Sequence, residues 1–476
     1  MKKLSLMAGT AAVLLAGCAG VPHGDPKIAQ LAPASLGLDT RSATIAEDWW
    51  TAFNDPQLNT LIAAGLAGNP SLESALARVR IAEAQLSAAK ADRLPQVSGL
   101  ANVEEANLGK HFISPEGRWS ATAIAAGNLS WNLDLFGRLR AGVDRARANT
   151  NAANLDVAAA RLMLASSIAQ AYVGLAQAEQ QIVVADGFVK TRQQALGFVK
   201  TRIRDQLSSN FDLETAQTLL AEAEQSRVRA LKQRELLIHA LAALVGRGAD
   251  FYPQIRPTSI ALDTAPAVPE LLPADLLGRR PDLLAAQARI EASVANRRVA
   301  RAAFYPNVNL GAFVGLASMG LSHFLSGDSV IGGAGPAISL PIFDGGKLRA
   351  QYRGATADLD RAVADYNDSV LAAVRDSADA ITNVRSADAD LATQMRVVGG
   401  LRETVRLNGV RTRTGLGSQL DAVESGFRLL AAEQELVGLQ ADALARRIQL
   451  ITALGGGFTP TAPVTTAASG ASEPRS

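Results

Sequence analysis

Residues 119–141 read WSATAIAAGNLSWNLDLFGRLRA, and two kinds of periodicity meet in this stretch. From Trp119 to Leu133 the odd positions are apolar apart from Gly127, whereas the even positions are mostly Ser, Thr, Asn or Asp. This alternation is typical of a β-strand with one apolar face, and the run exceeds the roughly 9–11 residues that cross a bilayer. From Leu139 onward the strand pattern gives way to a long stretch without proline, which predicts a helix.

The same pattern recurs in the second half of the chain. Gly137 and the following Leu139-Arg140-Ala141 correspond to Gly346 and Leu348-Arg349-Ala350, 209 positions later (346 − 137 = 209). A repeat held in register predicts two similar structural units within one chain. We place repeat 1 at 70–246 with a β-hairpin at 96–135, and repeat 2 at 274–455 with a β-hairpin at 306–343.

The four strands of these hairpins are too few to close a barrel, since the smallest known transmembrane type has about 8. A membrane barrel would therefore be shared between subunits, with 8 strands from two chains or 12 from three. The alternative is a pair of half-buried hairpins in an ordinary soluble sheet. The glycine-rich stretch Ala317–Gly333 is expected to be the exposed loop of the second hairpin.

Each predicted hairpin is followed by a very long helix. At 1.5 Å per residue, the proline-free run from Leu139 to Arg204 would reach about 100 Å. A short polar tip and a return helix follow in each half, so we expect a mainly α fold with a small β part and two rods of antiparallel helices. The matching long run in the second half is Leu348–Arg413. The tips are expected at 205–210 and 414–419, and the return helices at 211–245 and 420–454.

The N-terminus predicts the compartment. Lys2 and Lys3, a short apolar run and small residues before Cys18 have the layout of a secretory signal at 1–17. Leu15-Ala16-Gly17-Cys18 resembles a bacterial lipobox, which implies that the mature chain begins at a lipid-modified (palmitate-bearing) Cys18. Ala19 after the cysteine favours delivery to the outer membrane in that system. The tail 456–476, rich in Thr, Ala, Pro and Ser, is expected to be disordered.

The composition excludes several functions. A net charge of +2 without a basic tract argues against nucleic acid as a partner. No apolar run of about 18 residues follows the signal, so no transmembrane helix is expected. The four histidines share no metal spacing, Gly-x-Ser-x-Gly is absent, and Gly345-Gly346-Lys347 lacks the glycine that a phosphate loop needs. We therefore expect no enzyme, no cofactor and no metal.

Four motifs carry a family resemblance: Trp49-Trp50-x-x-Phe53-x-Asp55-Pro56, Leu129–Leu139, Arg279-Arg280-Pro281-Asp282 and Phe304-Tyr305-Pro306. With the two repeats, they make the chain similar to the TolC-like outer-membrane efflux proteins, and within them to the NodT-type lipoproteins. The resemblance spans Trp49 to Gly455.

The resemblance implies a homotrimer with a 12-stranded barrel in the outer-membrane lipid and an α-helical tunnel in the periplasm. An equatorial band would be built from 18–69, the proline-bearing linker 247–273 and the C-terminus. The implied role is the exit duct of a tripartite efflux pump, with a periplasmic adaptor and a proton-driven inner-membrane transporter as partners. Two alternatives stay open: a similar conduit for metal ions or secreted protein, and a lipid-anchored coiled-coil scaffold without a pore.

By the same resemblance, the residues of interest lie at the tips. Asp421 and Glu424 are three positions apart on one helix face, and in a trimer they would form two acidic rings that favour cations. Asp212 stands at the repeat position of Asp421. The alternative is that these acids only stabilise the helix start. Residues expected to contact the adaptor are Gly415, Leu416, Gly417, Ser418, Leu207, Ser208, Ser209, Arg202, Arg411 and Arg413.

The arginines around the tips admit more than one interpretation. Arg202, Arg204, Arg411 and Arg413 could bind adaptor carboxylates, hold a closed gate, or form a solvated basic face. The first tip also departs from the second, because Gln206 stands where the second tip has glycine.

Overall fold

The computed structural model describes residues 25–32, 36, 45–107, 119–263, 268 and 278–459. The signal at 1–17, Cys18 and the tail from 460 onward lie outside the described residues. The chain divides into two compact units. Unit 1 contains Ala77–Asn154, Ala285–Asn367 and the described residues up to Gln30, and unit 2 contains the other described residues.

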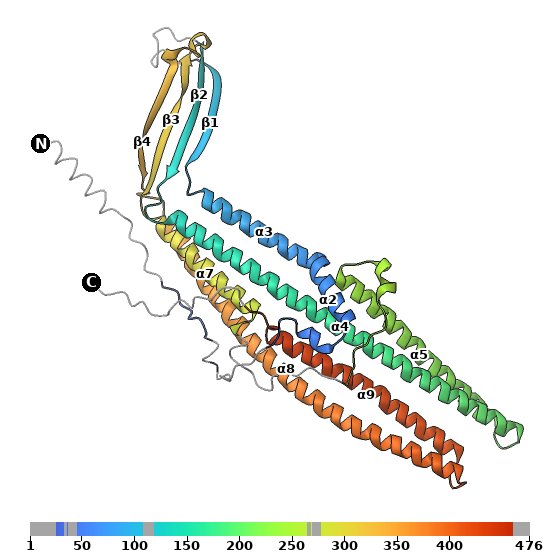
Figure 1. Cartoon of the computed structure of the whole chain (residues 1–476). Coiled ribbons are helices and arrows are strands. Elements are labelled where there is room, and N and C mark those ends of the chain that lie inside the picture. Colours follow the sequence, from blue (N-terminus) through green and yellow to red (C-terminus); the bar gives the residue numbers. More distant parts are fainter. Residues whose placement is uncertain are drawn as a thin grey trace. The chain divides into compact units, whose positions relative to one another are not determined.

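Unit 1 carries a four-stranded antiparallel sheet in the order β1-β2-β3-β4 (Figure 1). The strands are β1 (Gln96–Asn107), β2 (Trp119–Asn132), β3 (Asn307–Met319) and β4 (Val330–Ser339). The central ladder joins β2 of the first repeat to β3 of the second. The two predicted hairpins thus form one sheet.

The loop of the second hairpin is shorter than the sequence predicts. Ala317–Met319 belong to β3 and Val330–Gly333 to β4, so only the residues between these strands form the loop, with the short 3-10 helices η4 (Leu321–His323) and η5 (Gly327–Ser329). Gly333 pairs with Phe313 in the β3–β4 ladder. A Cβ at this position would lie only 3.0 Å from the Phe313 ring, so the close approach favours glycine. The glycine marks a close approach between strands and not a loop.

Two helices of 22 residues each, α3 (Pro70–Ala91) and α7 (Pro281–Ala302), precede the two hairpins. Both begin with proline, whose missing N–H costs nothing at the first helical position. Two helices of 67 residues each, α4 (Arg138–Arg204) and α8 (Lys347–Arg413), follow the hairpins. The long uninterrupted helices expected from the sequence are therefore confirmed.

Unit 2 contains α2 (Pro56–Gly68), α5 (Asn210–Val245), α9 (Gln419–Ala453) and the later parts of α4 and α8, with the 3-10 helices η2 (Trp49–Phe53) and η3 (Ala249–Gln254). Figure 1 shows α5 alongside α4 and α9 alongside α8. The two pairs touch where Phe188 of α4 stacks on Phe427 of α9, with ring centroids 6.4 Å apart. Fully buried side chains such as Ile168, Leu241 and Leu444 form the core.

One helix among the described residues, α4, is long and apolar enough by composition to cross a membrane. By length and composition, therefore, the expectation from sequence that no helix could span a membrane is wrong. The apolar window of α4 is 44% buried, and α4 supplies Ile168 and Tyr172 to the core of unit 2. A core helix passes the same composition test, because burial and a membrane favour the same side chains.

Candidate functional site

The register of the sheet gathers apolar side chains on one face. Leu129 lies opposite both Val97 of β1 and Ala312 of β3, and Val308 lies opposite Ile338 of β4. Several of these side chains are strongly exposed. On this face, apolar residues and glycine occupy every ladder position in β2, β3 and β4 whose side chain is described, except Ser318 of β3: Ala121, Ala123, Ala125, Gly127, Leu129, Trp131, Val308, Leu310, Ala312, Val314, Leu316, Val330, Gly332, Ala334, Pro336 and Ile338.

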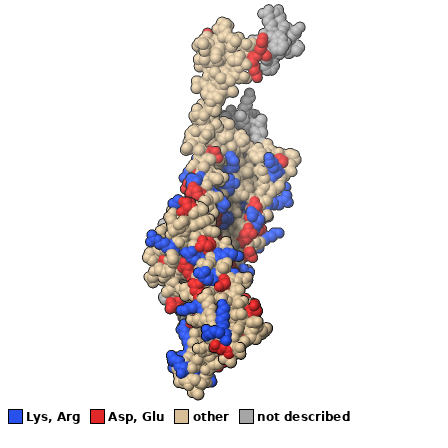
Figure 2. All heavy atoms as spheres, turned by 90° about the vertical axis from the view of Figure 1, so that its right-hand side faces the viewer, with Lys and Arg blue, Asp and Glu red and all other residues tan. Residues whose placement is uncertain are grey.

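The strands are almost free of charge. The four strands contain no Lys or Arg, and their only acidic residues are Glu104 and Glu105 of β1. On the face drawn in Figure 2, no blue side chain lies on the sheet at the top of the view. The opposite face is mixed: it carries Asn102, Asn128 and Asn309, but also Phe313, Met319 and Ile331. A sheet with one apolar face and most of its polar side chains on the other suits a wall between lipid and water.

Each edge strand of the sheet is paired on one side only within the part of the chain that the structure describes. β1 pairs with β2 and β4 pairs with β3. The free edges are 12 and 10 residues long. Exposed edges of this length invite pairing with another chain.

The two helical tips close with the same turn. The N–H of Leu207 donates to the carbonyl of Arg202 at 2.7 Å, and the N–H of Leu416 donates to the carbonyl of Arg411 at 2.8 Å. This bond spans five residues and is that of a Schellman C-cap, which requires a left-handed residue before the donor. Gln206 (φ 60°) and Gly415 (φ 75°) occupy that position.

Both return helices begin with a capping box. Ser209 and Asp212 cap α5, and Ser418 and Asp421 cap α9, with each serine accepting from the acid's N–H and each acid accepting from the serine's N–H. These bonds satisfy backbone groups that the helix start leaves unpaired. Donation from the Ser209 backbone, and then from its hydroxyl, holds the pKa of Asp212 below its ordinary value.

The predicted acidic pair is divided between two contacts. Asp421 caps its helix, whereas Glu424 accepts from Arg428 at 2.6 Å. Glu424 also lines a cavity of about 300 Å³ to which Asp212 of α5 contributes. Within one chain, Glu424 and Asp212 therefore line the same cavity, whereas Asp421 does not.

The cavity between the tips is largely apolar. Phe211 and Leu420, the first apolar residues of the two return helices, are 78% and 65% exposed and line it with Phe427. The guanidinium carbon of Arg192 lies 3.4 Å from the centroid of the Phe427 ring. Burial lowers the pKa of Arg192, although Glu222 partly opposes this.

Two of the tip arginines brace their own turns. Arg202 donates to the carbonyl of Leu207 at 2.9 Å and to the hydroxyl of Ser208 at 3.1 Å. Arg411 donates to the carbonyl of Leu416 at 3.3 Å. Arg204 lies 3.6 Å from Asp205. The side chain of Arg413 forms neither an ion pair nor a hydrogen bond with described residues.

Sequence reasoning missed a buried polar network in unit 2. Asp55, which is 1% exposed, accepts hydrogen bonds from the Tyr172 hydroxyl at 2.8 Å and from the N–H and hydroxyl of Ser259. It also caps α2, through the N–H groups of Gln57 and Leu58. Asp55-Pro56 is an N-cap signal that could have predicted the cap. Its partners in α4 and the linker are too distant in sequence to be foreseen.

Two pKa shifts follow from this network. Burial on its own would raise the pKa of Asp55, but the hydrogen bonds from Tyr172, Leu58 and Ser259 outweigh it and hold the pKa below the ordinary value. Burial, and then the bond to Asp55, raises the pKa of Tyr172. The pair is therefore an ionised carboxylate held by a neutral phenol. Among the described residues, no group of three or more His, Cys, Asp or Glu is arranged to hold a metal ion.

Comparison with known proteins identifies a family with this organisation. A family model described as "Outer membrane efflux protein" matches residues 61–247 and 272–456. The multidrug resistance outer membrane protein MdtP of Escherichia coli (strain K12) is 30% identical over 461 residues, or 94% of each chain. The fusaric acid resistance protein FusA of Burkholderia cepacia is 32% identical over 369 residues, which cover 74% of this chain and 69% of that one.

A solved structure shares the fold. The crystal structure of the outer membrane protein VceC from Vibrio cholerae superposes with a TM-score of 0.79 at 31% identity, covering 87% of this chain and 100% of that one.

Proposed function

Because the chain belongs to the outer membrane efflux protein family, whose members are transport conduits and not enzymes, we propose that it forms the exit duct of a tripartite efflux pump. Three chains would close their sheets into one 12-stranded barrel, with the apolar face toward lipid. The observation that carries the proposal is the sheet, which has one apolar face and two free edges. A soluble scaffold has no use for either feature.

The helices would continue the duct through the periplasm, and the tips would meet a periplasmic adaptor. Four large apolar side chains at the tips support this contact, because exposed apolar groups rimmed by polar ones mark interaction surfaces. They are Leu207, Phe211, Leu416 and Leu420, with exposed fractions of 64%, 78%, 73% and 65%. The resemblance adds Gly415, Gly417, Ser418, Ser208, Ser209 and Arg413 to this surface.

Asp421 and Glu424 remain the proposed gate. In a trimer each acid would occur three times around the axis, and rings of carboxylates favour cations. The capping role of Asp421 is compatible with this, because the bond from the Ser418 N–H occupies only Oδ2 of its carboxylate. Asp212, which lines the cavity with Glu424, would add a third acid at this level.

The work of transport would come from an inner-membrane partner, for which a proton-driven transporter is our proposal. The names of the relatives point to drug-sized organic molecules as cargo, since one confers multidrug resistance and another fusaric acid resistance. Cys18, which lies outside the described residues, would carry the acyl chains. The mass of the purified mature chain tests the last point: Cys18→Ser should remove the lipid mass.

The tip contact is tested by dye efflux in a strain that lacks the native gene. Gly415→Trp should abolish efflux while trimers remain in the outer membrane, because the indole would occupy the docking surface. Gly415→Ala is the matched control, since it shares the backbone strain of a left-handed residue without the bulk. Normal efflux with Gly415→Trp would contradict the adaptor contact, and so would equal loss in both variants.

A further inference from the structure

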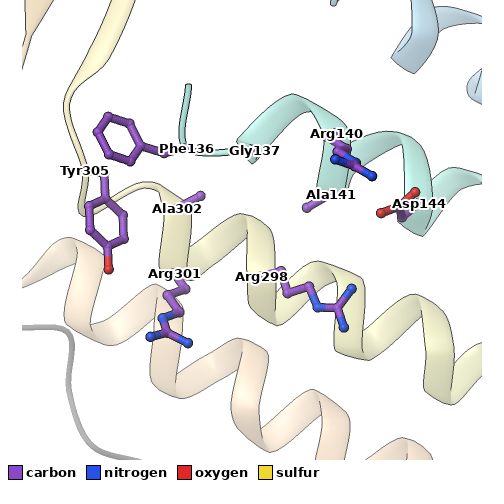
Figure 3. A pocket seen from close by; sticks show the side chains of 9 residues that line it. All are labelled: Phe136, Gly137, Arg140, Ala141, Asp144, Arg298, Arg301, Ala302 and Tyr305. Carbon is purple, nitrogen blue, oxygen red and sulfur yellow. The ribbon is translucent and has the colours of Figure 1, made fainter. Parts of the chain in front are cut away.

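The base of the sheet in unit 1 contains a cavity that the duct proposal does not use. It has a volume of about 370 Å³ and lies between the segment after β2, the start of α4 and the end of α7 (Figure 3). Phe136 and Tyr305 stack at one end of it, with ring centroids 5.0 Å apart and an interplanar angle of 11°. The volume falls in the range of small-ligand sites.

Three arginines line this cavity. Arg140 comes from α4, and Arg298 and Arg301 come from α7, as Figure 3 shows. None of their guanidinium groups forms an ion pair or hydrogen bond with the part of the chain that the structure describes. The one acid in the lining, Asp144, lies 3.4 Å from Arg147 and is thus already partnered. With three arginines and one aspartate, the lining carries a net positive charge (3 − 1 = +2).

The positive charge does not come from the helix start. The first N–H groups of α4 are already taken, because the carboxylate of Asp134 accepts from the N–H groups of Leu139 and Arg140 at 2.8 Å each. An anion in the cavity would be held by guanidinium side chains, which bind phosphate oxygens with two parallel N–H groups.

A second cavity of about 210 Å³ connects this basic site to the strands. It shares Phe136, Ala302 and Tyr305 with the first cavity and reaches Val308 of β3 and Ser339 of β4. Three apolar side chains at the same end of the sheet are strongly exposed: Leu135 at 66%, Ile342 at 73% and Phe343 at 91%. The arginines could contact the anionic head of an amphipathic ligand, and the exposed apolar side chains could contact its apolar body.

This arrangement has the composition of a membrane interface. Aromatic rings at the end of an apolar strand face mark the headgroup level of barrel proteins, and basic pockets at that level bind anionic headgroups. The larger cavity is lined by residues that follow β2 and precede β3, and by none of the edge strands β1 and β4, where a neighbouring subunit would pair. A lipid is therefore a better occupant than a second copy of the chain.

From these observations we infer that the cavity binds the phosphate group of a membrane glycerophospholipid through Arg140, Arg298 and Arg301, with the Phe136–Tyr305 pair packing against its glycerol and the start of its acyl chains. The inference rests on the proposed function, because it requires the sheet to span the membrane. The bound lipid would hold the barrel and the helices at a defined depth in the bilayer.

The test uses the purified trimer, stripped of lipid with detergent and then mixed with phosphatidylglycerol micelles or with inorganic phosphate. Native mass spectrometry counts the bound molecules. The wild type should bind phosphatidylglycerol at a stoichiometry of one per chain, and the variant R140Q/R298Q/R301Q should bind at least about tenfold more weakly, since the charge-assisted bonds are lost. Arg361→Gln is the matched control, because Arg361 pairs with Asp358 and Asp365 on α8, outside the cavity.

Two outcomes would overturn the inference: undiminished lipid binding by the triple variant, or binding of inorganic phosphate in competition with the lipid, which would assign the cavity to a soluble anion. Trimer formation and ion conduction, measured on the same samples, keep the duct proposal separate. If the wild type and the variant both conduct but bind lipid equally, only the lipid site fails. If neither assembles or conducts, the proposed function fails.

Discussion

The two tips have the same backbone but differ at its most demanding position. Gln206 in the first tip and Gly415 in the second both adopt left-handed φ values, 60° and 75°. Both turns close with a hydrogen bond of nearly the same length, and both are followed by a Ser–Asp capping box. The hydrogen bonds of the turn therefore decide the conformation, and the residue decides only how much it costs.

The two repeats differ more in the buried side chains of their cores than in their tips. Tyr172 of repeat 1 and Ile381 of repeat 2 are 209 positions apart (381 − 172 = 209) and both are buried. Tyr172 donates to Asp55 within a polar network, whereas Ile381 packs in an apolar cluster with Val384 and Leu450. The two halves thus share their tip turns and capping boxes, but they differ in the chemistry of their buried side chains. Removal of a capping box should therefore act equally in both halves, whereas changes at the left-handed residues should differ in size and changes in the two cores should differ in mechanism.

The largest expected effect is that of Asp55→Ala. It should lower the free energy of unfolding by about 2–4 kcal/mol, because the Tyr172 hydroxyl loses its buried acceptor and α2 loses its cap. Ile381→Ala, at the repeat position of Tyr172, should cost a similar amount, about 2–4 kcal/mol, by leaving a cavity. Thermal unfolding of the detergent-solubilised chain measures both.

The pH dependence separates these two variants. The lowered pKa of Asp55 means that its stabilisation is present above the ordinary value of 3.8 and is lost as the pH falls through the lower folded value. The penalty of Asp55→Ala should therefore shrink in acid, whereas that of Ile381→Ala should not. A parallel decline in both would show that the carboxylate is not the source of the stability.

The second effect concerns the left-handed residues. Gly415→Ala should destabilise the second tip by about 1–2 kcal/mol, because a Cβ is disfavoured at this φ although nothing lies within 4 Å of it. Gln206→Ala should have almost no effect, because Gln206 already bears that strain. Hydrogen exchange of the tip amides gives the comparison. Equal effects would mean that the two turns are not equivalent in solution.

The third effect should be the same in both halves. Ser209→Ala and Ser418→Ala each remove an N-cap, at a cost of about 1 kcal/mol. The first turns of α5 and α9 should exchange their amide hydrogens faster by the same factor in the two variants. A clear difference would argue against equivalent capping boxes.

The smallest effect separates the two bracing arginines. Arg202→Ala removes two hydrogen bonds to its tip and Arg411→Ala removes one long bond, so the first should loosen its turn more, by at most about 1 kcal/mol at an exposed site. The rates of hydrogen exchange at the backbone amides of Leu207 and Leu416 measure this difference. A larger effect of Arg411→Ala would reverse the predicted order.

The features that sequence could predict are those that depend on neighbouring residues. Proline-free runs predicted the two 67-residue helices, alternation predicted strands such as β2, and the repeat predicted matching tips. Local signals also misled, because Gly332 and Gly333 indicated a loop where the structure has paired strands. A glycine in a turn and a glycine under an aromatic ring look alike in sequence.

The candidate sites depend on residues that the fold brings together from afar. Asp55 and Tyr172 are 117 positions apart, and no local pattern predicts their contact. The cavity at the sheet base joins residues of both repeats, such as Arg140 and Arg301. The residue types were visible in the sequence. Their partners became visible only when the β2–β3 ladder placed one repeat beside the other.

The most direct test of the duct is single-channel conductance of the purified protein in a planar bilayer, beside the Asp421→Asn/Glu424→Gln variant. The proposed structure predicts small, cation-selective current steps in the wild type and weaker selectivity in the variant, because the acidic rings lose their charge. Trimers of both forms that insert into the bilayer and carry no current, even under conditions that loosen the helices, would contradict the conduit.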